Sequence, residues 1–154
     1  MPLDHAWIAA HIPHQGSMCL LQRVETWDAE HIRCAAISHR DPANPLRTHG
    51  RLGAACGIEY AAQAMAVHGA LVGAGEAGEA RHGYLTSVRG VTLNVARLDD
   101  LKADLVIEAE RLGGDGNTIL YAFSVRADET TLLAGRAAVV LDATALTRSA
   151  GTSA

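Results

Sequence analysis

The sequence predicts an α+β domain in which an antiparallel sheet of about six strands curls around one long central helix. The longest helical pattern, residues 53 to about 74, follows two strand-like segments. Four more strand-like segments come after it, and short polar turns separate the later ones. We expect these four to form an antiparallel meander that joins the first two strands in one sheet.

The N-terminal third predicts a short helix followed by a hairpin. Residues 4–11 read as a helix, because Asp4 can cap its first turn and Pro13 stops the pattern. Segments 19–27 and 31–38 are rich in strand-forming residues and are separated by a compact polar break. They are expected to pair as an antiparallel hairpin.

The middle and C-terminal parts complete the pattern. Residues 39–50 contain two Asn- or Asp-preceded prolines and three charged side chains, which predicts an irregular loop. The long helix at 53–74 is rich in alanine and glycine and can therefore approach a sheet closely. The later strands are expected at 84–97, 101–113, 117–127 and 131–143. A helix inserted after the second strand of such a sheet is the hotdog fold; we expect a single domain over 1–143 and a disordered tail at 144–154.

Composition excludes several classes of function. The chain has 154 residues, a formal net charge of −4 and Lys102 as its one lysine, so we expect no nucleic acid partner. No basic leader or long apolar span is visible, which predicts no membrane association. Three cysteines without C-x-x-C spacing favour a reducing cytoplasm. No spaced cluster of His, Cys and carboxylates predicts a metal site.

Three local motifs carry a family resemblance. IPHQGSMCLLQRV (12–24) resembles the opening of the 3-hydroxyacyl-(acyl carrier protein) dehydratases, and GIEYAAQAMA (57–66) resembles their central helix. HRDPANPLR (39–47) is similar to a signature of the aryl-polyene branch, and the likeness covers roughly residues 8–142. The resemblance implies a hotdog enzyme without a cofactor that dehydrates acyl chains on acyl carrier protein. It also implies a homodimer or a dehydratase heterocomplex.

The active-site loop departs from the family pattern. The family histidine stands fourteen residues before the glutamate, whereas His49 stands ten residues before Glu59. Either His49 replaces that histidine across a four-residue deletion, or GRLG overlays the family loop and Arg51 takes the place. In the second case His39 is a further candidate for the base.

Dehydration needs a base for the C2 proton and an acid for the C3 hydroxyl. We expect Glu59 to be the acid, with its pKa raised by burial, and His49 to be the base. Gln63, one turn on, would orient the carboxyl. Gly57 would admit the substrate and help offer backbone N–H groups to the thioester carbonyl, and His14 is interpreted as a structural, supporting residue.

Other readings share the same fold. Glu59 could instead activate water in an acyl-thioester hydrolase, or the chain could be a catalytically weakened subunit that supports an active dehydratase. We expect a symmetric dimer through the edge of the strand at 84–97. The loop arginines Arg40, Arg47 and Arg51 are expected to contact an acidic carrier protein.

Overall fold

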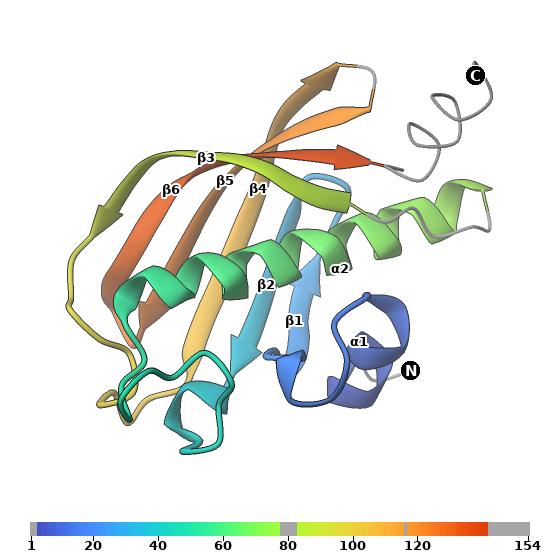
Figure 1. The fold of residues 1–154 in the computed structure, drawn as a ribbon. Helices are drawn as coiled ribbons and strands as arrows, with labels where there is room; N and C mark the ends of the chain where they lie inside the picture. Colours follow the sequence, from blue (N-terminus) through green and yellow to red (C-terminus); the bar gives the residue numbers. More distant parts are fainter. Residues whose placement is uncertain (1–2, 78–82, 116, 142–154) are drawn as a thin grey trace, which may run out of the picture.

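A six-stranded antiparallel sheet wraps around one long helix in the computed structural model, which describes residues 3–77, 83–115 and 117–141 (Figure 1). The helices are α1 (His5–His11) and α2 (Gly57–Ala77), and short 3₁₀ turns occur at Gly16–Met18, Ser38–Arg40 and Ala54–Cys56. The strands are β1 (Arg23–Trp27), β2 (His31–Ala36), β3 (Gly83–Leu93), β4 (Leu105–Asp115), β5 (Thr118–Ala127) and β6 (Thr130–Leu141). The predicted hotdog fold is confirmed. The predicted tail at 144–154 lies outside the described residues.

The strand order is β1-β2-β4-β5-β6-β3, which corrects one part of the predicted meander. The first hairpin and the β4-β5-β6 meander are confirmed, but β3 pairs with β6 and not with β4. The physical reason is the long connection 94–104 between β3 and β4. It runs alongside residues 52–54, which precede α2, and does not form a tight turn. Two backbone hydrogen bonds hold it there, Ala54 N to Ala96 O at 3.0 Å and Leu98 N to Leu52 O at 2.8 Å. As a result β3 lies at the edge of the sheet, as expected.

Local sequence explains where the helices begin. Asp4 is the N-cap of α1, because its carboxylate accepts the N–H of Trp7 at 3.0 Å. The α-helical part of the central helix begins at Gly57, later than the predicted residue 53, since a 3₁₀ turn occupies the preceding residues.

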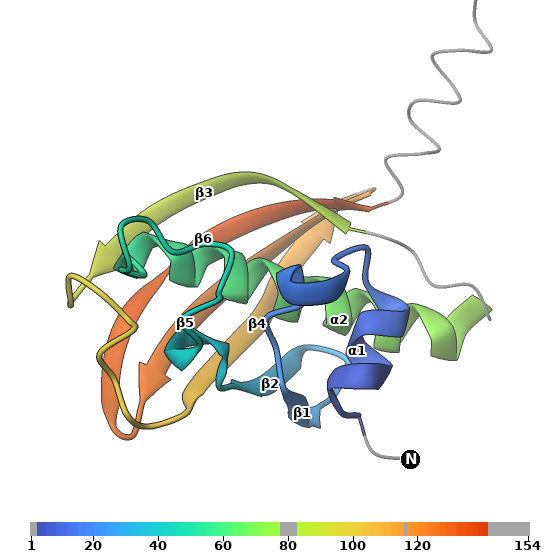
Figure 2. The same ribbon diagram turned by 60° about the horizontal axis from the view of Figure 1, so that its bottom comes forward.

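The core lies between α2 and the concave face of the sheet. Alternate residues of β5 are buried against the helix, and the intervening ones are turned to the other face. Figure 2 shows α1 and α2 on the same side of the sheet, with α1 alongside α2. Two polar side chains of α2, Gln63 and His68, are fully or almost fully buried in this core. Among the described residues, no helix combines the length and apolar character needed to cross a membrane.

Candidate active site

Glu59 lies in the first turn of α2, beside the segment that connects α1 to the first 3₁₀ turn. Its Oε1 atom is 3.0 Å from Nε2 of His14, and the two side chains are 34% and 25% exposed. The pair is therefore half-buried, and a molecule of solvent or substrate can reach the carboxylate. An imidazole in contact with a carboxylate is a group that can both accept and donate protons.

The end of α1 places His14 at this position. Ile12, the C-cap of α1, is buried, and Pro13 prevents continuation of the helix. The side-chain amide of Gln15 donates to the carbonyl of Ala9 at 3.1 Å and to that of Ile12 at 3.4 Å. His14 therefore lies between Ile12, which is buried, and Gln15, whose side chain is hydrogen-bonded to the end of α1.

Gln63 joins this segment to α2 from the next turn of the helix. Its Nε2 donates to the carbonyl of Met18 at 2.7 Å, and its Oε1 accepts the N–H of Leu20 at 2.8 Å. The same Nε2 lies 3.5 Å from Oε1 of Glu59. Gln63 thus holds the chain that carries His14 against the helix that carries Glu59.

The electrostatics of Glu59 differ from the sequence expectation. Hydrogen bonding to His14 lowers the pKa of Glu59 below its ordinary value, partial burial opposes this, and the His14 charge and Gln63 add to the lowering. Burial was expected to dominate and to raise this pKa. That expectation is wrong, because the carboxylate keeps about a third of its exposure and gains two hydrogen-bond donors. Glu59 is consequently ionised at neutral pH.

Neither of the two histidines predicted as bases contacts the Glu59 carboxylate within the described chain. His49 is exposed in a tight turn between Thr48 and Arg51, with a left-handed φ of 52°. His39 is fully buried in a 3₁₀ turn, where its Nε2 contacts the carbonyls of Leu101 and Ala103 at 3.1 and 3.0 Å.

Burial lowers the pKa of His39, and its Nδ1 has no hydrogen-bond partner among the described residues. Within the described chain the polar side chains that contact Glu59 are His14 and Gln63. The IPHQG motif contains His14, but its position beside Pro13 by itself indicates a structural role and not a contact with Glu59.

Gly57 allows α2 to pack closely on the sheet, and its role in substrate access stays a prediction. A Cβ at this position would lie 2.5 Å from Cδ2 of Leu133 on β6, so the absent side chain lets α2 approach the sheet. The N–H groups of Cys56 and Gly57 donate to carbonyls of the preceding 3₁₀ turn and its N-cap. Both N–H groups are thus engaged within the chain, and the binding of a thioester carbonyl by backbone N–H groups at the helix start stays a prediction.

The comparisons with known proteins fit this geometry. The sequence profile described as "ApeP-like: ApeP dehydratase" matches residues 6–148, a span that contains the whole sheet, His14 and Glu59. The chain belongs to the ApeP-like dehydratase family. A search of curated proteins gave no match.

Solved structures support the family and the fold. The ApeP-like chain is similar to the dehydratase heterocomplex ApeI:P from Xenorhabdus doucetiae, with a TM-score of 0.76 and 25% identity over 91% of this chain and 90% of that one. A mutant thioesterase from Pseudomonas aeruginosa gives a TM-score of 0.64 and 13% identity over 90% and 93% of the two chains. A thioesterase from Haemophilus influenzae gives 0.57 and 11% over 77% and 76%. The two thioesterases show the shared hotdog fold alone.

Proposed function

We propose that the ApeP-like chain eliminates water from a 3-hydroxyacyl thioester, with Glu59 and His14 as the acid–base pair. The observation that carries the proposal is the 3.0 Å contact between these two side chains at the start of α2, in a chain of a dehydratase family. The contact places a proton acceptor next to a proton donor. Dehydration of a 3-hydroxyacyl chain needs both, because C2 loses a proton while the hydroxyl on the adjacent C3 gains one.

The reaction balances when the pair begins as imidazolium and carboxylate. Glu59 takes the proton from C2, the C2–H electrons form the C2=C3 double bond, and the C3–O bond breaks. His14 gives its Nε2 proton to the departing hydroxyl, which leaves as water. A proton then passes from Glu59 to His14 across their contact and restores the pair. The lowered pKa of Glu59 keeps its carboxylate in the ionised form that a base requires, so its proposed role changes from acid to base.

Assembly is part of the proposal. The Glu59 side chain is 34% exposed, whereas proton transfer from carbon is favoured in a site that excludes water. Within the described residues β3 presents a long unpaired edge, with exposed apolar side chains at Tyr84, Leu85 and Leu93. A second hotdog subunit that adds its own edge strand to β3 would extend the sheet. The partner is a second copy of this chain or, by analogy with the ApeI:P heterocomplex, a related dehydratase subunit.

Substitution of Glu59 by Gln tests the proposal. The change keeps the shape of the side chain and removes its charge, so dehydration should fall about 10²- to 10⁴-fold while the fold is retained. Glu110→Gln, at an exposed carboxylate of β4, is the matched control and should be neutral. The assay follows loss of water by mass spectrometry and release of free thiol on the same thioester. Full dehydration by Glu59→Gln would refute the mechanism, and thiol release in place of dehydration would identify a hydrolase.

A supporting subunit is the second candidate, because the similar solved structure is a heterocomplex and His49, one of the two candidates for the place of the family histidine, is exposed. This candidate predicts that the chain alone dehydrates nothing and that Glu59→Gln has no effect on a complex with an active partner. Comparing the two preparations distinguishes it from catalysis by this chain.

A further inference from the structure

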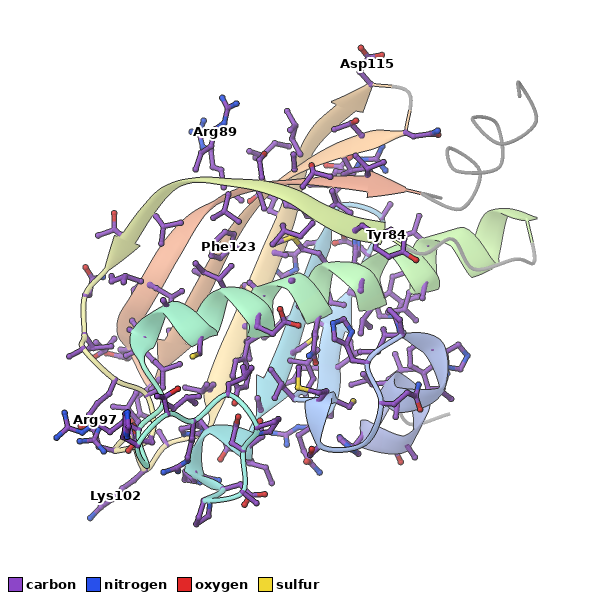
Figure 3. All side chains as sticks on the ribbon, viewed as in Figure 1. Tyr84, Arg89, Arg97, Lys102, Asp115 and Phe123 are labelled. Atoms are coloured by element: carbon purple, nitrogen blue, oxygen red, sulfur yellow. The ribbon has the colours of Figure 1, made fainter. Side chains whose placement is uncertain are left out.

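The face of the sheet that points away from α2, called here the outer face, carries an uneven distribution of charge. Its side chains are fixed by the strand register, in which Arg33 pairs with Glu108 and Ala122 pairs with Arg136. Figure 3 shows Arg89 on the side of β3 away from α2, and Phe123 on the side toward it. By this register the outer face carries five arginines and three carboxylates, namely Arg23, Arg33, Arg89, Arg126, Arg136, Glu108, Glu110 and Asp115. It is thus a positive face on a chain whose net charge is −4.

The half of the outer face near β2 neutralises its own charge. Glu108 contacts His31 at 3.1 Å and Arg33 at 3.6 Å, and it also receives a hydrogen bond from Arg126. His31, Arg33 and Arg126 thus each contact the Glu108 carboxylate, although the Nε atom of Arg33 has no hydrogen-bond partner among the described residues. The arginines of this cluster therefore already have an anionic partner within the chain.

The half near the β3 edge leaves its charge uncompensated. Arg89 and Arg136 lie directly opposite each other on β3 and β6, and both are exposed. Neither makes an ion pair with any residue in the described part of the chain. Like charges on directly opposed strand positions destabilise a sheet, so an anion bound between them would relieve a cost that the free chain carries.

A groove lies beside this arginine pair. It has a volume of about 570 Å³, and its lining includes Arg89, Arg136 and the leucines Leu112 and Leu120. These leucines are 49% and 48% exposed, which is high for large apolar side chains. Gly90, with a φ of 60°, lies in a bulge of β3 and also lines the groove. The surface thus offers two cations next to an apolar hollow.

The positive charges of Arg89 and Arg136 indicate which kind of partner can bind at this groove. A second copy docked through the same face would bring four unpaired arginines together, which disfavours self-association there. The loop arginines expected to bind an acidic partner are largely engaged within the chain. Arg40 donates to the carbonyl of Lys102 and to Asp104, and Arg47 donates to the carbonyls of His39 and Gly50.

We propose that Arg89, Arg136 and the adjoining leucine groove dock the acidic carrier protein that delivers the thioester substrate. Carboxylates of the carrier pair with the two arginines, and an apolar side chain next to them enters the hollow between Leu112 and Leu120. The inference rests on the proposed function, and the acyl carrier protein as bearer of the thioester is what the family resemblance implies. The surface itself is defined by the unpaired arginines and the exposed leucines.

Charge reversal at Arg136 tests the docking surface, because β6 is not an edge strand and the substitution leaves the β3 edge intact. Binding of purified acyl carrier protein without an acyl chain is measured by fluorescence anisotropy at low and high NaCl. We expect Arg136→Glu to weaken binding at least tenfold and Arg136→Gln to weaken it less, with the wild-type affinity falling as salt rises. Arg51→Glu, at the exposed loop arginine, is the matched control and should change affinity less than twofold.

Three outcomes would overturn the inference: unchanged binding by Arg136→Glu, equal weakening by Arg51→Glu, or Arg136-dependent binding to anionic phosphatidylglycerol vesicles without binding to the carrier. A short 3-hydroxyacyl thioester without a carrier separates this inference from the proposed function. Arg136→Glu should dehydrate it at the wild-type rate. If the wild-type protein does not dehydrate it, the proposed function fails while the carrier-binding result still stands.

Discussion

Replacing Gln63 by Leu should cost both stability and activity, because this side chain holds the His14 segment on α2. Leucine has a similar size and cannot replace either hydrogen bond. The Leu20 N–H, in a residue that is 2% exposed, and the Met18 carbonyl would both lose their partner. An unsatisfied buried group costs about 1–3 kcal/mol. Met18 is only partly buried, so water can reach its carbonyl more easily than the Leu20 N–H.

The expected destabilisation of Gln63→Leu is therefore about 2–4 kcal/mol, or a fall in melting temperature of roughly 5–15 °C for a domain of this size. Urea unfolding followed by circular dichroism measures the free energy, and the dehydration assay measures activity on folded protein. If Gln63 acts by positioning His14, then Gln63→Leu should reduce activity alone but add little in a His14→Ala background. Additive losses of activity in the double variant would refute this reasoning, as would wild-type stability of the single variant.

Two further predictions concern buried groups. Burial lowers the pKa of both His39 and His68, so the unfolded chain binds their protons at higher pH than the folded protein does. The free energy of unfolding should be highest above about pH 6.5 and should fall as the pH drops below that value, by at most about 1.4 kcal/mol per histidine down to pH 5.5. Urea unfolding at several pH values measures this dependence. The His68→Gln variant should show a weaker dependence of unfolding free energy on pH. Gly57→Ala should destabilise the fold by about 1–3 kcal/mol because its Cβ meets Leu133, and Leu133→Ala in the same chain should relieve part of that cost in thermal unfolding. Independent, additive costs would show that the two residues do not touch.

Local pattern was sufficient for most of the elements. The Asp4 cap, the alanine-rich central helix and the period-two alternation of β5 depend on neighbours a few residues away, so they could be read directly from the sequence. Short turns between β4, β5 and β6 determined their pairing for the same reason. The motifs around His14 and Glu59 led to the dehydratase family, which the match over residues 6–148 confirms.

Long-range packing decided the rest. Alternation in β3 shows that it is a strand but not which neighbour it takes, and the connection 94–104 carries it away from β4 to the open side of β6. The partner of Glu59 was equally non-local, because His14 stands 45 positions earlier and reaches it only through the contacts that Gln63 makes with Met18 and Leu20. The direction of the Glu59 pKa shift follows from that contact and from the remaining solvent exposure. The sequence thus determined the elements and the family, whereas the tertiary structure determined which side chains meet, since contact between distant residues depends on the packing of the whole sheet around α2.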